Sequence, residues 1–210
     1  MARRGVAGVD GCRGGWVVAH HGTVQVLAAF TDVLTLDVEV IAVDMPIGLP
    51  DAGPRACDVE ARGRLGPRRS SVFAAPVRSV LHERSYADAL ARHRATDGRG
   101  LSKQAFHLLP KIAEVEAALD DRVIEAHPEL AFARLLGAPA RHPKRTPAGR
   151  AERLAALGLA SRPRVRGAAP DDVLDAIALT HVARRVLAGD AERLGDGGRD
   201  GRGLRMAIWA

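Results

Sequence analysis

Five acidic residues are spaced so that folding would gather them at one edge of a sheet. Asp10 and Asp44 each end an apolar run typical of a buried strand, and Glu125 lies in a third such run. Asp172 and Asp175 are three residues apart near the start of a helical segment, so they share one helix face. Carboxylates brought this close repel one another unless a cation lies between them. Oxygen ligands of this kind suit Mg²⁺ or Mn²⁺, and we therefore expect metal chemistry.

Asp175 is the member of this set that ordinary helix chemistry explains least. Acids in a first turn complement the helix dipole, which accounts for Asp171 and Asp172. Asp175 is instead followed by the apolar run 176–179, on a helix that is apolar nearly all round. A half-buried carboxylate at that position needs a partner. The candidate metal ligands are therefore Asp10, Asp44, Asp172 and Asp175, and the candidate catalytic set adds Glu125.

The first part of the chain has the pattern of strands. Short apolar runs separated by glycine-bearing turns predict three antiparallel strands over 6–10, 16–20 and 23–27. A short helix is expected over about 31–36. The nearly continuous apolar run 38–44 then indicates a strand buried on both faces, as in a parallel sheet.

The rest of the chain is mainly helical, with a fifth strand expected over 122–126. Ser, Thr or Pro residues mark the helix starts, and glycines mark most of the ends. Pro110 is expected either to kink the segment that Ser102 opens or to begin a new helix. The expected helices cover 54–65, 85–96, 102–119, 128–137, 146–158 and 170–189.

This order of elements predicts an α/β fold of the ribonuclease-H-like type. The expected sheet is mixed, with five strands in the order 3-2-1-4-5 flanked by helices, and extra helices are inserted between strands 4 and 5. Adjacent strands lie about 4.8 Å apart, so Asp10, Asp44 and Glu125 would fall within roughly 10 Å along one edge. Ligands of open α/β sheets bind at the carboxyl ends of the strands, where these residues lie.

Six short segments resemble the DUF429 family, and together they span most of the chain. The family is regarded as a set of predicted nucleases within the ribonuclease-H-like superfamily, so the resemblance implies metal-dependent cleavage of a phosphodiester more firmly than it implies a substrate. The segments that carry the resemblance are 8–16, 43–49, 68–73, 102–104 with 110–112, 125–129 and 171–176.

Other polar residues are candidate substrate contacts, each with an ordinary structural alternative. The basic loop 68–71 either cradles a phosphate or caps a helix. His127 is either a proton shuttle or the N-cap of the helix that follows it. The loop 141–145 adds Arg141, Lys144 and Arg145 as basic residues that would reach the same edge. The candidate substrate-binding residues are Arg13, Arg68, Arg69, Ser70, Ser71, Lys103, Gln104, Lys111 and His127.

Length and composition narrow the class of protein. The chain has 210 residues, 47% of them apolar, which predicts one domain over 1–210 with a flexible loop over 190–203. No apolar stretch approaches the roughly 18 residues that a membrane span needs, and no signal peptide is evident, so we expect a cytoplasmic protein without a membrane partner. The two cysteines have neither disulfide nor zinc spacing.

Charge and aromatic content bear on the partner. The net charge of +6 permits a polyanionic partner such as nucleic acid, but only three of the 31 basic residues are lysines, a bias that composition alone can produce. Aromatic residues make up only 3% of the chain, which argues against a surface for stacking exposed bases.

Three functions remain open at this stage. The leading hypothesis is a metal-dependent nuclease or related phosphodiesterase that acts on nucleic acid or a nucleotide-like substrate, with Mg²⁺ or Mn²⁺ activating water. The alternative is a nucleotide-binding or phosphotransfer module of the actin and sugar-kinase type, in which the glycine-rich turn 11–15 would wrap phosphates. A single core in 210 residues argues against that alternative. The third is a non-catalytic relative, and the oligomeric state stays open.

Overall fold

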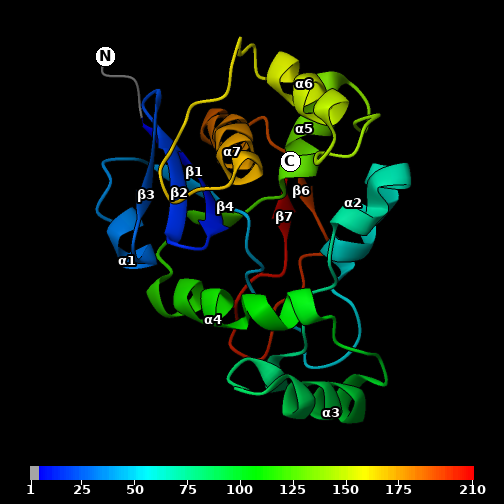
Figure 1. Ribbon diagram of the computed structural model, residues 1–210. Helices are drawn as coiled ribbons and strands as arrows, with labels where there is room; N and C mark the ends of the chain where they lie inside the picture. Colours follow the sequence, from blue (N-terminus) through cyan, green and yellow to red (C-terminus); the bar gives the residue numbers. More distant parts are fainter. Residues whose placement is uncertain (1–4) are drawn as a thin grey trace.

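A computed structural model describes residues 5–210, and its centre is the five-stranded sheet that the sequence predicts. The strand order is β3-β2-β1-β4-β5, so the predicted order 3-2-1-4-5 is confirmed (Figure 1). The strands are β1 (Val6–Cys12), β2 (Gly15–His20), β3 (Thr23–Leu27), β4 (Val40–Val43) and β5 (Val123–Glu125).

The sheet is antiparallel on one side of β1 and parallel on the other. β1, β2 and β3 form a meander, in which Cys12 pairs with Gly15 across a tight turn. β4 runs parallel to β1, with Val9 opposite Val43, and β5 runs parallel to β4. All four residues of β4 are buried, which explains its unbroken apolar sequence. The carboxyl ends of β1, β4 and β5 therefore lie side by side.

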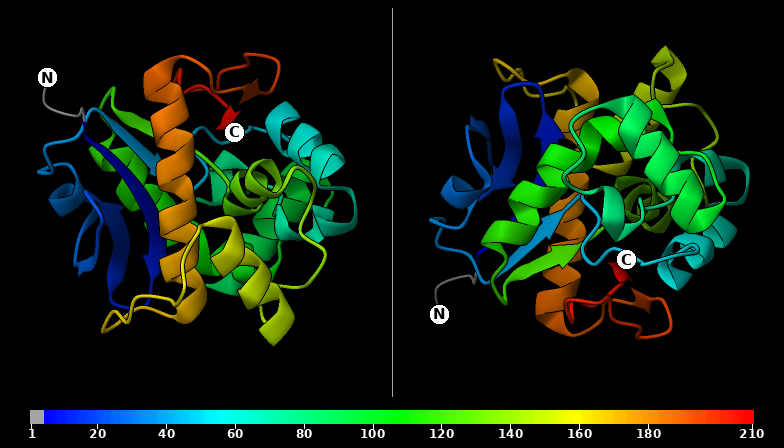
Figure 2. Two further views of the ribbon diagram at one scale, coloured as in Figure 1. Left: turned by 90° about the horizontal axis from the view of Figure 1, so that it is seen from above. Right: turned by 90° about the horizontal axis from the view of Figure 1, so that it is seen from below.

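Helices cover both faces of this sheet (Figure 2). α7 (Pro170–Ala188) packs against one face, where Ala42 of β4 shares a buried cluster with Leu179. α1 (Phe30–Val33) and α4 (Lys103–Ala118) cover the other face, where Val43 shares a cluster with Ile112. Neighbouring residues of one strand thus face opposite layers, as strand geometry requires.

A glycine sets how closely α7 approaches the sheet. A Cβ placed on Gly8 would lie 2.1 Å from the carbonyl oxygen of Ala176 and 2.6 Å from the amide nitrogen of Thr180. Only a residue without a side chain allows the backbone of α7 to rest on β1 at this distance. The close approach places the first turns of α7 beside the carboxyl end of β1.

The predicted insertion between β4 and β5 is also confirmed. It holds α2 (Ala56–Leu65), the 3₁₀ turns η1 (Gly66–Ser71) and η2 (Arg78–Val80), α3 (Tyr86–Asp97) and α4. Ser85 and Ser102 cap α3 and α4 with their side chains, as their positions indicated. Pro110 lies inside α4, which continues through it as one helix. α5 (Pro128–Leu136) and α6 (Pro147–Ala156) follow β5.

The last segment of the chain adds a small second sheet. β6 (Arg193–Leu194) pairs with β7 (Ile208–Trp209), and Trp209 also bridges to Ala126 beside β5. The segment 190–203, expected as a flexible loop, contains β6 and the buried Asp200, which accepts a hydrogen bond from the Leu49 amide at 3.0 Å. Across residues 5–210, every helix is too short or too polar to cross a membrane.

Candidate active site

Asp10 and Asp44 lie next to each other at the carboxyl ends of β1 and β4. Val9 pairs with Val43 in the parallel ladder, and the Asp44 amide donates to the Val9 carbonyl at 2.9 Å. This register brings the residues that follow Val9 and Val43 to the same level of the sheet. Both acids keep part of their surface exposed at the edge where the sequence placed them.

Asp175 projects from α7 toward the same edge and is almost completely buried, with 2% of its surface exposed. Its Oδ2 accepts a hydrogen bond from the ammonium group of Lys144 at 2.6 Å. Its Oδ1 is buried and has no hydrogen-bond partner among the described residues. A buried carboxylate oxygen without a donor is costly, so this atom is the strongest single indication of a missing ligand.

Asp172 lies one turn earlier in α7, where it both caps the start of the helix and adds negative charge to the acidic edge. Its Oδ2 accepts the backbone amide of Ala169 at 3.1 Å, which satisfies a free donor at the start of the helix. The residue is otherwise partly exposed and close enough to Asp10 and Asp44 to affect their ionisation. The dipole argument made for Asp172 from the sequence therefore accounts for only part of its environment.

The crowding of these acids shifts their pKa values upward. Burial raises the pKa of Asp44 to about 7, although the Lys144 ammonium opposes the shift. Burial likewise raises the pKa of Asp175 to about 6 against the same ammonium. The pKa of Asp10 is raised well above its usual range by burial and then by the charges of its acidic neighbours, Asp44 foremost. Positive charge beside these acids opposes the shifts and stabilises their ionised forms.

Among residues 5–210, Lys144 is the basic side chain that forms an ion pair with one of these acids, Asp175. Burial lowers its pKa, but the carboxylate of Asp175, followed by those of Asp10 and Asp44, outweighs burial and raises the pKa above the usual range. Lys144 belongs to the loop between α5 and α6, far from α7 in sequence. The loop 141–145 was expected to bring basic charge near this edge, and Lys144 does so directly.

Glu125 belongs to a different cluster. Both of its oxygens accept hydrogen bonds from the guanidinium of Arg55, and Oε2 also accepts the Ile47 amide at 2.7 Å. Arg55 in turn contacts Asp58 at the start of α2. The carboxylate is therefore fully engaged in a buried ion-pair network. These contacts support a structural role for Glu125 rather than the catalytic role expected from its place at the end of β5.

His127 is similarly occupied on both ring nitrogens. Nδ1 accepts the Glu129 amide at 3.2 Å, which makes His127 the N-cap of α5, and Nε2 donates to the Ser71 carbonyl at 3.2 Å. Burial lowers its pKa, so the ring is neutral. The contacts favour the N-cap interpretation over the proton shuttle.

Some of the candidate substrate-binding residues form hydrogen bonds within the protein, whereas others are exposed to solvent. The Arg68 guanidinium donates to the carbonyl oxygens of Ala140, at 2.8 Å, and Arg141, so it holds the loop before α6. Lys111 donates to the Gly15 carbonyl at 2.7 Å, and its ammonium lies 4.1 Å from the centre of the Trp16 ring, which locks the turn after β1. The exposed candidates are Arg13, Arg69, Ser70, Lys103 and Gln104.

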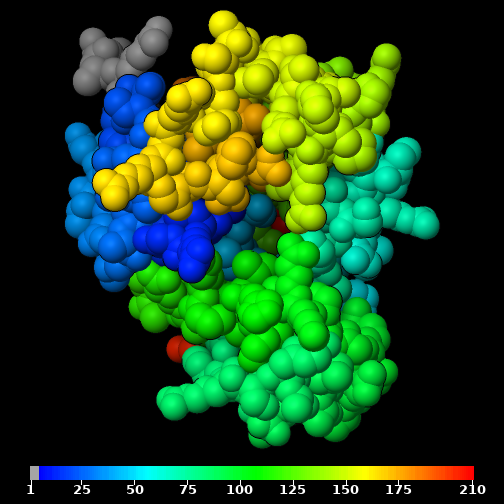
Figure 3. All heavy atoms as spheres, viewed as in Figure 1, coloured from blue at the N-terminus to red at the C-terminus, as the bar shows by residue number. Residues whose placement is uncertain are grey.

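The molecular surface is hollowed beside the start of α7 (Figure 3). Figure 3 shows the hollow between the turn after β1, the start of α7, the chain before α6 and the helix α4 below. These four segments come from four distant parts of the sequence.

The donors at this edge suit a hard divalent ion in kind. They are carboxylate oxygens, and one of them is buried without a partner. As the side chains stand, no three Asp, Glu, His or Cys side chains within residues 5–210 converge closely enough to enclose an ion. Binding would therefore require Asp10 or Asp44 to turn toward the free oxygen of Asp175.

Comparison with known proteins bears on the family. A family model described as "Protein of unknown function (DUF429)" matches residues 8–198, which is most of the chain. The chain belongs to the DUF429 family. The match includes Asp10, Asp44, Asp172 and Asp175. No curated protein and no solved structure matches this DUF429 chain.

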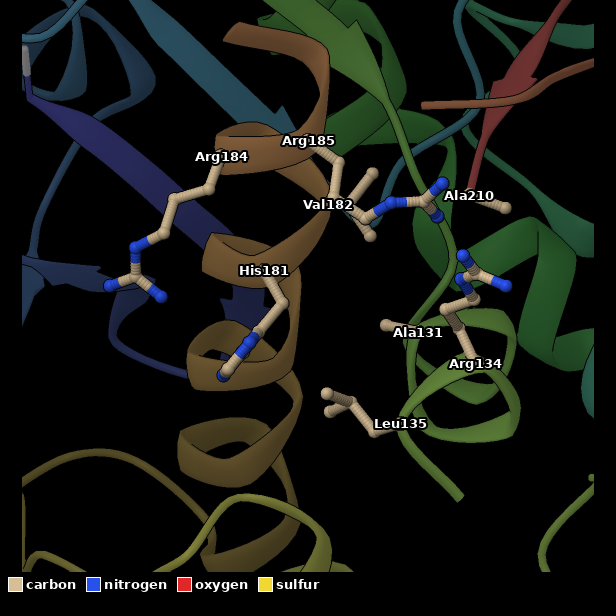
Figure 4. Close-up of a pocket in the computed structure, with 8 residues that line it drawn as sticks. All are labelled: Ala131, Arg134, Leu135, His181, Val182, Arg184, Arg185 and Ala210. Atoms are coloured by element: carbon tan, nitrogen blue, oxygen red, sulfur yellow. The ribbon is translucent and has the colours of Figure 1, made fainter. Parts of the chain in front are cut away.

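A separate groove in this DUF429 protein lies away from the acids, between α5 and the second half of α7. Figure 4 shows Arg134 and Arg185 approaching each other from the two helices over apolar side chains, while Arg184 points away. The cavity measures about 180 Å³, and its lining contains no acidic side chain. The groove contains none of the candidate acids and is not part of the candidate active site.

Two basic residues that pair with the candidate acids of this DUF429 protein could hardly be recognised from the sequence. Arg55 was not a candidate, because an arginine before a helix looks like any surface residue. Lys144 appeared only as one of three basic residues in a loop. The unusual scarcity of lysine, with three in the whole chain, was the one feature that could have drawn attention to it.

Proposed function

We propose that this protein is a metal-dependent phosphodiesterase of the ribonuclease-H-like type, acting on nucleic acid or a related phosphoester. The observation that carries the proposal is the buried, unpaired Oδ1 of Asp175 beside Asp10 and Asp44 at the carboxyl edge of a parallel sheet. The strand order is the one expected of that fold type.

Asp10, Asp44 and Asp175 would hold Mg²⁺ or Mn²⁺, and Asp172 would support them from the start of α7. When bound, the ion would lower the pKa of an attacking water and stabilise negative charge on the phosphoryl oxygens. The residues of the chain would orient the substrate: Asp10 and Asp44 lie at the carboxyl edge of the sheet with part of their surface exposed, and the exposed Arg13 and Arg69 are available for flanking phosphates.

The nucleotide-binding alternative has less support. A phosphate-wrapping turn needs free backbone amides in an open loop. The turn after β1 instead closes tightly, with Cys12 paired to Gly15, and Lys111 fixes the Gly15 carbonyl. These contacts favour the phosphodiesterase over the nucleotide-binding module.

The test is cleavage of fluorescent single-stranded and double-stranded DNA and RNA, together with a chromogenic phosphodiester, in Mn²⁺, Mg²⁺ or EDTA. We expect cleavage with metal, none in EDTA, and at least a hundred-fold loss in Asp10→Asn and Asp44→Asn. Asp171→Asn is the matched control, because Asp171 shares the first turn of α7 without contributing to the cluster's ion pair.

Two results would overturn the proposal. One is the absence of both cleavage and Mn²⁺ binding, measured by thermal shift at millimolar metal. The other is tight binding of a nucleoside triphosphate without any oligonucleotide binding, which would favour the nucleotide module.

A further inference from the structure

The Lys144 ammonium occupies one of the two carboxylate oxygens of Asp175. Two-ion phosphodiesterases place their ions about 3.5–4 Å apart, so the carboxylate between them must serve both. Asp175 is the buried carboxylate of this site, and its Oδ2 is already occupied by the Lys144 ammonium at 2.6 Å. Only Oδ1 is left without a partner.

The remaining acids provide ligands for one ion. Within residues 5–210, no hydrogen bond engages the carboxylate of Asp10 or Asp44, so both are free to turn toward Oδ1 of Asp175. Asp172 has one oxygen committed to the Ala169 amide at 3.1 Å. Within residues 5–210, the oxygens left for an ion are therefore those of Asp10 and Asp44 and Oδ1 of Asp175, while Oδ2 of Asp175 is held by the ammonium.

The loop that carries Lys144 is anchored on both sides. The ion pair between Lys144 and Asp175 therefore belongs to an ordered part of the chain. Before it, Arg68 binds the Ala140 carbonyl at 2.8 Å, and Arg153 binds the His142 carbonyl at 3.1 Å. After it, the Thr146 side chain caps α6. The side chain of Lys144 itself is about 40% exposed, and its acidic partner Asp175 is 2% exposed.

We propose that Lys144 takes the place of the second cation in this site, so that the site accepts one divalent ion instead of two. The inference rests on the proposed function. An ammonium group supplies a compact charge and hydrogen-bond donors but no Lewis acidity. Lys144 would thus stay in the site with the ion bound and contact a phosphoryl oxygen on the side away from the ion.

The first experiment is the stoichiometry of Mn²⁺ binding by electron paramagnetic resonance and calorimetry on the full chain. We expect one ion per chain in the native protein and two in Lys144→Met, because removing the ammonium frees Oδ2 of Asp175. Lys103→Met is the matched control and should stay at one ion, since Lys103 is exposed on α4. Lys144→Arg retains the charge and should also stay at one.

A second measurement uses the unmodified protein, in case the variants fold poorly. The chain has only three lysines, so ¹⁵N-lysine labelling gives three ammonium signals. Lys111 lies over the Trp16 ring, and Lys103 is exposed, which distinguishes their signals from that of Lys144. We expect the Lys144 signal to persist, with slow hydrogen exchange, at saturating Mg²⁺.

Three outcomes overturn the inference: two ions bound by the native protein, one ion still bound by a folded Lys144→Met, or a Lys144 signal that becomes solvent-exposed when Mg²⁺ binds. A flat titration with no ion bound by any variant has a different meaning. It removes the proposed metal-dependent function and this inference with it.

Discussion

The guanidinium of Arg55 donates two hydrogen bonds to the carboxylate of Glu125, from Nη1 to Oε2 and from Nη2 to Oε1, each 2.7 Å long. Both residues are buried, and Asp58 completes the network from the first turn of α2. Arg55 also donates to the carbonyl oxygens of Ile47 and Gly48. The network therefore ties the end of β5 to the chain that leaves β4, directly behind Asp44.

We expect Arg55→Met to destabilise the protein by about 3–5 kcal/mol, because it leaves two buried carboxylates without their partner. Glu125→Gln should be destabilising as well, and it should leave Mn²⁺ affinity within a few-fold of the native value. Urea unfolding and calorimetry measure the two effects. Arg64→Met is the control, since its ion pairs with Glu60 and Glu192 are exposed and contribute about 0–1 kcal/mol. A Glu125→Gln protein of native stability that no longer binds Mn²⁺ would make Glu125 a metal ligand.

We expect Gly8→Ala to cost about 1–3 kcal/mol or more, because the added methyl group collides with the backbone of α7 at Ala176. The helix must shift to admit it, and Asp172 and Asp175 shift with it, so Mn²⁺ affinity should fall together with stability. Gly63→Ala in α2 is the control, because a Cβ there meets open space and a helical alanine is favoured by about 0.5–1 kcal/mol. Native metal affinity in Gly8→Ala would show that the spacing of α7 from β1 does not position the acids.

We expect the metal-free protein to lose stability as the pH rises from about 4 to 7. The pKa of Asp44 is raised from its ordinary value of 3.8 to about 7 in the folded state, so the folded protein binds this proton more tightly than the unfolded chain does. Stability from this group is complete below the unfolded pKa and disappears as the pH passes the folded one. Asp44→Asn should flatten the slope and gain on the order of 2 kcal/mol at pH 8 in EDTA. Melting temperatures at several pH values measure this.

The outcome that would contradict the pH prediction is a destabilised Asp44→Asn. It would mean that the carboxylate accepts a structural hydrogen bond that the asparagine cannot replace. Asp171→Asn serves as the control for removing one negative charge from the same region.

We expect oligonucleotide binding to weaken steeply with salt, because each neutralised phosphate contributes about −0.9 to the log–log slope on duplex and about −0.7 on single strands. Arg13→Ala with Arg69→Ala should weaken binding and reduce the slope by about 1.4–1.8, since both arginines are exposed and each would neutralise one phosphate. Fluorescence anisotropy of a 20-mer at several salt concentrations measures it. Arg68→Ala is the contrasting variant. The Arg68 guanidinium donates to two carbonyl oxygens, so its removal should lower the stability of the protein and leave the salt slope unchanged. A slope unchanged by the double variant would place the substrate elsewhere.

The sequence by itself determined the sheet and the place of its acids. Strand order follows from apolar runs, turn glycines and helix caps, which are local signals. Asp10 and Asp44 come directly after buried strands, and the carboxyl ends of parallel neighbours must meet. Asp175 stood out because a carboxylate on an apolar helix face needs a partner.

Only the tertiary structure decided which partner each charged residue takes. Glu125 ends a parallel strand just as Asp10 does, yet it binds Arg55, which is 70 positions away. Lys144 reaches Asp175 from 31 positions away through a loop whose path depends on Arg68 and Arg153. Local patterns report which face of an element is buried, whereas the pairing of long side chains depends on how loops place distant elements within a few ångströms. For that reason the sequence located the acidic edge, and the fold selected the cation that now lies in it.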